Sequence, residues 1–154
     1  MTLITRTMQM TDLDEIIDFE KTLLAKTNED EMDREIQSWN ARWRSESLSH
    51  HLPMGWSFSA RDEGGKLLGY FIAQPLLFFD GQTQSLWVEH FQTIDETAAH
   101  DLFELAYRLA REKHFQKVYL PANLLLSPTI NKLAQAWKSL PWAPETIFLK
   151  TTKG

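Results

Sequence analysis

The segment LWVEHFQTIDETAAHDLF, residues 86–103, changes its hydrophobic period once and thereby indicates the fold. Its first half is mostly apolar up to Phe91, which is typical of a buried strand, and we expect that strand over Leu86 to Thr93. From about Glu96 to His114 the apolar residues recur at helical spacing instead, which predicts a long amphipathic helix. A strand that turns directly into a helix is typical of an α/β domain, and we expect any chemistry of this chain at that junction.

The sequence before the junction predicts a strand followed by two helices. The strand covers residues 4–8, and Thr11 is expected to cap the first helix. The polar face of that helix is predicted to be solvated and is marked by Asp12, Asp14, Glu15 and Asp18. Apolar residues spaced by three or four then predict a second helix from about Asp30 to Leu48, which Pro53 and Gly55 end.

Two further strands are expected between the second helix and the junction. They cover Trp56 to Ala60, where apolar and serine residues alternate, and the apolar run Leu67 to Phe79. A turn at Asp80-Gly81 would connect the longer run to the strand from Leu86. The three strands are therefore predicted to pair antiparallel.

After the long helix, the sequence predicts a strand, a helix and a last strand. These cover Lys117 to Leu120, a helix that starts at Ser127-Pro128, and Thr146 to Lys150. The full order indicates the α/β (α+β) class, with a mixed, mostly antiparallel central sheet flanked by helices. Because no linker or repeat interrupts the pattern, residues 1–154 are expected to form one domain.

Composition narrows the classes of function. The 154 residues contain no cysteine, so disulfides, thiolate metal sites and cysteine nucleophiles are excluded, and a cytoplasmic protein is expected. The formal net charge of -5, without a basic stripe, argues against nucleic-acid binding. No apolar run approaches the roughly 20 residues that cross a bilayer, so no membrane contact is expected. His50-His51 lacks a third ligand at metal-binding spacing, and no metal site is predicted.

Three segments, taken in order, resemble one known family. They are Thr5-Arg6-Thr7-Met8 with Thr11-Asp12-Leu13-Asp14, then Leu86-Trp87-Val88-Glu89-His90, and finally residues 131–142, NKLAQAWKSLPW. Together with the element order, they are similar to the GNAT superfamily of acetyl-coenzyme A dependent N-acetyltransferases over nearly the whole chain. The resemblance implies transfer of an acetyl group from acetyl-coenzyme A to the primary amine of a small molecule or peptide.

The resemblance also implies where the coenzyme binds. In the family, backbone N–H groups in the first turn after the fourth strand hold the pyrophosphate. The family motif, Gln or Arg, two residues, Gly, one residue, then Gly or Ala, falls on residues 94–99, where only Ala99 matches. The implied coenzyme-binding residues are Phe91, Thr93, Thr97, Ala98, Ala99, Asn123 and Asn131. Asp95 and Glu96 would repel phosphate, and Asp95 could instead cap the helix.

Glu89 is the leading candidate for the general base. A carboxyl group in the middle of an apolar strand loses water, which raises its pKa toward a useful value. Glu89 could equally point outward or pair with an arginine, and the sequence leaves both readings open. His90 is expected on the opposite face, because side chains alternate along a strand.

The general acid is less well defined by the sequence. The family tyrosine that protonates the leaving thiolate aligns with Trp137, whose indole cannot act as an acid. Tyr119 could substitute for it, or could be a tyrosine of the core or rim.

Two functional hypotheses therefore stand after the sequence alone. The first is an N-acetyltransferase that uses acetyl-coenzyme A. The alternative, favoured by Thr97 and Trp137 at family positions, is a non-catalytic GNAT-like domain that acts as a small-molecule sensor or protein-interaction module. An edge strand could also pair two copies into a homodimer.

Overall fold

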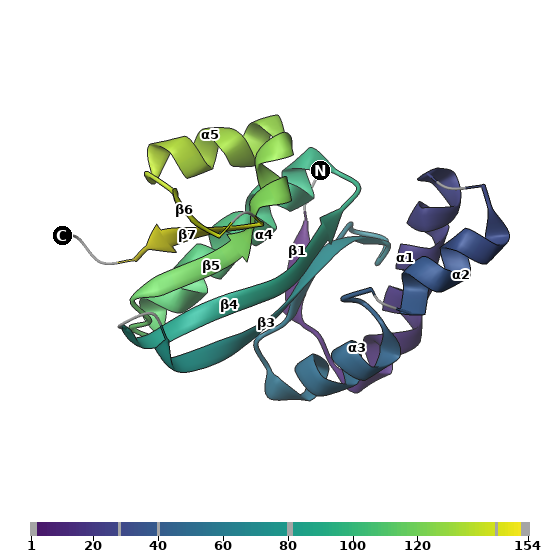
Figure 1. Ribbon diagram of the computed structural model, residues 1–154, viewed down its shortest axis with the longest axis horizontal. Coiled ribbons are helices and arrows are strands. Elements are labelled where there is room, and N and C mark those ends of the chain that lie inside the picture. The colour runs from purple at the N-terminus through teal and green to yellow at the C-terminus, as the bar shows by residue number, and fades with distance from the viewer. Residues whose placement is uncertain (1–2, 28, 40, 80–81, 144, 152–154) are drawn as a thin grey trace.

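The computed structural model describes residues 3–27, 29–39, 41–79, 82–143 and 145–151 (Figure 1). Within them, seven strands form one sheet in the order β1-β2-β3-β4-β5-β7-β6. The strands are β1 (Ile4–Thr7), β2 (Phe58–Arg61), β3 (Leu67–Phe79), β4 (Gln82–Thr93), β5 (Lys117–Pro121), β6 (Leu140–Ala143) and β7 (Thr146–Lys150). All neighbours pair antiparallel except β4 and β5, which are parallel. The predicted mixed, mostly antiparallel sheet is confirmed.

Helices cover both faces of this sheet. The α-helices are α1 (Leu13–Thr27), α2 (Glu31–Trp39), α3 (Ser45–His51), α4 (Glu96–Glu112) and α5 (Pro128–Ala136), with short 3-10 turns η1 (Met10–Asp12), η2 (Leu52–Met54) and η3 (Ala122–Leu126). Helices α1 to α3 lie together on one side of the molecule, and α5 lies on the other (Figure 1). No helix of the described residues is both long and apolar enough to span a bilayer.

Two apolar clusters hold the layers together. The larger one joins β3, β4 and β5 to the buried stripe of α4, where Leu102, Phe103 and Ala106 are fully buried. The smaller one joins β3 to α1 and α3 through Ile16, Leu48 and neighbouring residues. Burial of a large aliphatic or aromatic side chain is worth about 1.5–3 kcal/mol, so these stripes fix how the helices sit on the sheet.

The prediction of a single helix from Asp30 to Leu48 is wrong. Helix α2 ends at Trp39 and α3 begins at Ser45, with a turn over residues 41–44. The apolar residues that predicted one helix do not share one buried face. Trp39 is 66% exposed, whereas Leu48 is fully buried beneath the sheet. Burial of Leu48 against β3 outweighs continuation of the helix, because the chain must turn to bring this residue to the core.

The prediction that the acidic face of the first helix is solvated is only partly right. Asp12 is buried and accepts hydrogen bonds from the Gln9 backbone N–H (2.9 Å) and from Arg6 (3.0 Å). The N-cap residue of this turn is therefore Gln9 rather than the expected Thr11, and Asp12 is the third residue of the turn, which bonds back to the cap. Glu15 pairs with the buried guanidinium of Arg61 on β2, at 2.6 and 2.9 Å. A buried guanidinium needs carboxylate partners, and these residues supply them.

Two details of the strands also differ from the expectation. Strand β6 was not predicted, because its first three residues are all exposed and show no alternation. It forms an antiparallel pair with β7 at the edge of the sheet. The expected turn at Asp80-Gly81 lies outside the described residues.

Strand β4 contains a one-residue bulge opposite the middle of β3. Ile72 pairs with His90 and Ala73 pairs with Val88, so Glu89 has no partner residue on β3. A bulge of this kind bends the strand and reverses its alternation beyond that point. It therefore places two consecutive side chains, those of Glu89 and His90, on the face that α1 and α3 cover.

A close approach between β3 and β4 requires glycine at position 69. A Cβ there would lie 2.5 Å from Thr93 Cγ2 and 2.8 Å from the Gln92 carbonyl oxygen. We expect Gly69→Ala to lower the free energy of unfolding by about 1–3 kcal/mol, because the strands must separate to relieve the clash. Urea denaturation measures the loss.

The matched control for this variant is Gly64→Ala. A Cβ at Gly64 would meet Asp62 Oδ1 at 3.4 Å, an ordinary contact, so little loss is expected. Adding Thr93→Ala to Gly69→Ala should restore part of the stability. Equal stability of the two single variants would contradict the steric account.

The ion pair of Glu15 should make stability depend on pH. The hydrogen bond from Arg61 lowers the pKa of Glu15 below its ordinary value of 4.5. Its stabilising contribution is therefore present above about pH 4.5 and is lost as the pH falls through the lower pKa of the folded state. We expect Glu15→Gln to have a lower Tm than the wild type at pH 7, with the gap closing in acid.

The control for this experiment is Asp18→Asn, which changes an exposed carboxylate on the same helix. Its Tm difference from the wild type should stay small at every pH. If the Tm difference between the wild type and Glu15→Gln stays constant from pH 7 to pH 3, the result would argue against the ion pair.

Candidate active site between β4 and β5

The candidate site is a cleft that opens where β4 and β5 part. The two strands pair only over Ser85–Trp87 and Lys117–Tyr119, after which β4 continues to Thr93 and β5 ends at Pro121. A cavity of about 410 Å³ occupies the gap. Its walls are the β4 residues from Trp87 to Phe91, the start of η3 at Ala122-Asn123, and the side of β7 near Thr146.

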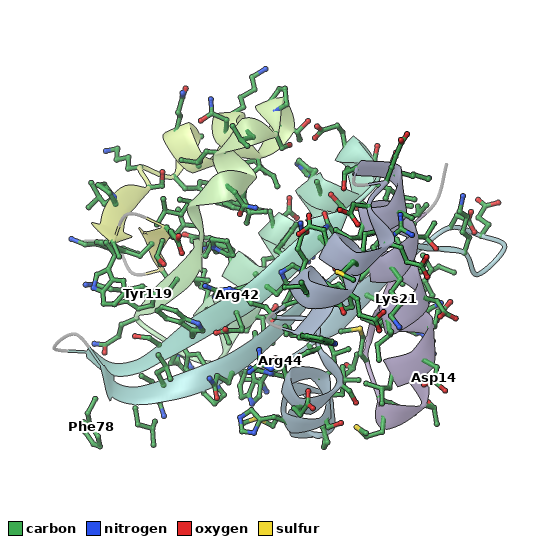
Figure 2. The ribbon with its side chains drawn as sticks, turned by 45° about the vertical axis from the view of Figure 1, so that its right-hand side comes forward. Asp14, Lys21, Arg42, Arg44, Phe78 and Tyr119 are labelled. Carbon is green, nitrogen blue, oxygen red and sulfur yellow. The ribbon has the colours of Figure 1, made fainter. Side chains whose placement is uncertain are left out.

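The charged groups at this cleft are Arg42, Glu89 and Glu145. Arg42 comes from the turn between α2 and α3 and lies in front of the strands (Figure 2). Its guanidinium donates to the Glu89 carboxylate at 3.1 Å and to the Glu89 carbonyl oxygen at 3.2 Å, and it lies 3.9 Å from Glu145. Two carboxylates face one guanidinium, so this part of the cleft has an excess of negative charge.

Glu89 is held in place from two sides. Besides Arg42, the indole N–H of Trp87 donates to its carboxylate at 2.7 Å. The arginine-paired alternative of the sequence analysis is therefore the arrangement found, but the side chain still lines the cleft rather than open solvent. Whether Glu89 acts as a base stays a prediction.

The expectation that His90 lies on the opposite face from Glu89 is wrong. Both residues line the cleft, and His90 Nε2 lies 2.9 Å from Glu20 Oε1 on α1. The physical reason is the bulge at Glu89, which adds one residue to β4 and cancels the alternation between the two side chains.

Comparisons with known proteins find no match by sequence but many by structure. No family model matches the sequence, and no curated protein matches it significantly. Solved structures do match. A GNAT-family acetyltransferase from Staphylococcus aureus Mu50 gives a TM-score of 0.67 at 10% identity, covering 98% of this chain and 100% of its own. The PaiA N-acetyltransferase from Thermoplasma acidophilum, solved with coenzyme A, gives 0.66 at 10% identity, covering 99% and 100%. This chain has the GNAT fold.

A third GNAT-fold match is the polyamine N-acetyltransferase of Drosophila melanogaster, which forms N-acetylagmatine. It gives a TM-score of 0.59 at 14% identity and covers 97% of this chain and 98% of its own. Identities this low show a shared backbone arrangement and leave the residues of the site to be judged from their own geometry.

Of the residues predicted to bind coenzyme, Phe91 and Asn123 line the cleft of this GNAT fold. The ring of Phe91 is itself buried and stacks on Phe71, so it contributes mainly through its backbone. Thr93 lines a different cavity, next to α1. Asn131 lies within α5 and is absent from the cleft walls.

The candidate general acid, Tyr119, and the residue at the family tyrosine position, Trp137, are both packed against other aromatic rings. Tyr119 is fully buried and contacts Trp87, Trp142 and Phe148, and its role as an acid stays a prediction. Trp137 ends α5 and stacks on Phe103 and Tyr107 of α4. It does not line the cleft, so its indole is a packing residue of the α4–α5 contact.

The first turn of α4 is already capped by the protein. Asp95 is the N-cap residue, and its carboxylate accepts from the Ala98 N–H at 3.0 Å. Glu96 Oε2 accepts from the Ser127 hydroxyl at 2.5 Å, which ties this turn to the start of α5. Thr97 is exposed, whereas Ala98 and Ala99 are buried in the core.

These residues decide how well a coenzyme would fit. The cleft matches an acyl group and its flexible arm, because β4 has no strand partner on the β5 side beyond Trp87 within the described residues. The α4 turn does not match a pyrophosphate, because Asp95 uses one of its amide donors and two carboxylates stand there. The fit is therefore good at the reacting end and poor at the phosphate end.

The cap at Asp95 can be tested by two substitutions. We expect Asp95→Ala to lower the free energy of unfolding by about 0.5–2 kcal/mol, because the Ala98 N–H loses its acceptor. Asp95→Asn should cost only a few tenths, since asparagine caps helices about as well. Urea denaturation of both variants measures this. Equal losses would show that the negative charge, rather than the hydrogen bond, stabilises the turn.

Proposed function

We propose that this chain is an N-acetyltransferase that moves an acetyl group from acetyl-coenzyme A to a primary amine. The observation that carries the proposal is the cleft between β4 and β5, which joins an open strand edge to a carboxylate at Glu89. The GNAT fold shared with solved acetyltransferases supports it.

The open edge of β4 would supply the cleft with hydrogen-bond donors. Bound coenzyme would supply the acetyl thioester. Among the described residues, the β5 side of β4 lacks a strand partner beyond Trp87, so backbone N–H groups on that side would be available to a carbonyl oxygen. Such donors stabilise the negative charge that develops on this oxygen during attack, without reorganising.

The charges of the cleft favour a cationic acceptor. Glu89 and Glu145 outnumber Arg42 there, and the whole chain carries a formal net charge of -5. A protonated amine would be attracted to this end and could replace Arg42 as the partner of Glu89. Two of the similar structures are acetyltransferases of agmatine and polyamines, which are cationic amines.

Calorimetric titration with acetyl-coenzyme A and with desulfo-coenzyme A tests the donor. We expect both to bind weakly, because Asp95 and Glu96 repel the phosphates. Asp95→Asn should bind them severalfold more tightly, since removing one nearby charge in a solvated site is worth about 1 kcal/mol. If neither ligand binds the wild type or Asp95→Asn at millimolar concentration, the transferase proposal fails.

An acetylation assay with a panel of primary amines tests the acceptor. We expect Glu89→Gln to raise KM for cationic amines severalfold, because the ammonium loses a charged partner. The matched control is Glu145→Gln, which changes a carboxylate at the rim whose side chain is 87% exposed. Glu145→Gln should raise KM for cationic amines less than Glu89→Gln does. The reverse order would contradict the role of Glu89 as the partner of the ammonium group.

The second candidate function is a non-catalytic sensor with the same fold. The specific observation in its favour is the α4 turn, where the chain's own carboxylates occupy the place of a phosphate. Binding of coenzyme or an amine without acetyl transfer to any member of the panel would select this alternative.

A further inference from the structure

A buried carboxyl group outside the machinery described above contacts three polar side chains. Glu20, on α1, is 3% exposed. It accepts from the Tyr70 hydroxyl at 2.5 Å and from Gln92 Nε2 at 3.4 Å, and it lies 2.9 Å from His90 Nε2. Acceptance from Tyr70 and Gln92 matches the ionised form, which has only acceptors.

This arrangement determines which nitrogen of His90 carries the proton. Burial, together with the adjacent Glu20, raises the pKa of Tyr70 well above its ordinary value, so its hydroxyl keeps its proton and donates. The carboxylate then has no proton to give to His90, and Nε2 must be the donor of the 2.9 Å contact. In the neutral ring, Nδ1 is left with a lone pair.

His90 lies at the boundary of two cavities. His90 lines the cleft between β4 and β5, and it also lines a second cavity of about 370 Å³ bounded by Glu20, Leu24 and Trp43. Its side chain is 20% exposed. Among the described residues, Nδ1 has no hydrogen-bond partner, whereas the carboxylate of Glu89 is already shared by Arg42 and Trp87.

We propose that His90 is the general base of the acetyl transfer and that Glu20 is its positioning residue. The inference rests on the proposed function. His90 Nδ1 takes a proton from the substrate ammonium, and the resulting imidazolium is stabilised by the Glu20 carboxylate. The free amine attacks the thioester carbon, the C–N bond forms, the C–S bond breaks, and the second amine proton leaves with the thiolate.

The charged and titratable groups around this ring come from several elements. Those in contact are Glu20 on α1 and Tyr70 on β3. Those that line the same two cavities are Lys26, Arg42, Glu89 and Glu145. Of all these, only Glu20 contacts an imidazole nitrogen of His90, so its charge should have the largest effect on protonation of the ring.

The first test replaces the base but keeps its hydrogen bond. His90→Gln can still donate an amide N–H to Glu20 but cannot accept the ammonium proton. We expect kcat to fall by about 100-fold or more, with KM for the amine changed much less. The matched control is His100→Gln, which changes a histidine on α4 that does not line the cleft, and its kcat should equal that of the wild type.

The second test addresses positioning by Glu20. In Glu20→Gln the imidazolium loses the charge beside it, so the acidic limb of the pH–rate profile should move to lower pH. A merely structural role would reduce activity without moving this limb. Circular dichroism and thermal unfolding show whether the variant is folded.

A third measurement needs no turnover. Long-range proton–nitrogen NMR spectra of the wild type at pH 8 should show His90 protonated on Nε2 and unprotonated on Nδ1. His90→Gln assigns the signals. A proton on Nδ1 instead would overturn the proposal whatever the activity.

The outcomes separate the two proposals. If the wild type acetylates an amine and His90→Gln stays within threefold of it, the role of His90 is overturned and the acetyltransferase stands. If the wild type acetylates no amine of the panel, the acetyltransferase fails, and the base proposal fails with it. A large loss of kcat in His90→Gln, with the Nε2–H tautomer in the wild type, supports both.

Discussion

The parting of β4 from β5 is the constraint on which the rest of this molecule depends. The two strands pair over only three residues, and the bulge at Glu89 bends β4 just beyond them. In the part of the chain that the structure describes, β4 then has no strand partner on the β5 side, so the sheet has an open edge at its centre rather than at its rim. An open strand edge at this position would suit a ligand that can accept hydrogen bonds from the backbone.

The same bulge organises the side chains around the cleft. It brings Glu89 and His90 onto one face, where each meets a partner from another layer of the fold. Arg42 reaches Glu89 from the turn between α2 and α3, and Glu20 reaches His90 from α1. The helices on this face therefore do more than cover the sheet, since they determine which cleft residue contacts an arginine and which contacts a carboxyl group.

The two ends of the site differ in how well they suit a coenzyme. The cleft has an open edge of β4, whereas the first turn of α4 has its own anions at Asp95 and Glu96. Capping by Asp95 stabilises the long helix that holds the larger apolar cluster, and this stability works against binding of a phosphate at the same turn. An acetyltransferase with such a turn would rely on the reacting end of its donor for most of the binding energy.

The sequence by itself determined those features that depend on local periodicity and local capping. The change of period across residues 86–103, the order of most elements and the cap at Asp95 follow from neighbouring residues alone. Only the tertiary structure decided the bulge at Glu89, the break between α2 and α3, strand β6 and the contact between Glu20 and His90. Each of these balances one local preference against packing with a segment far along the chain. Glu20 and His90 are separated by 70 positions in the sequence, and no local signal indicates that their side chains meet.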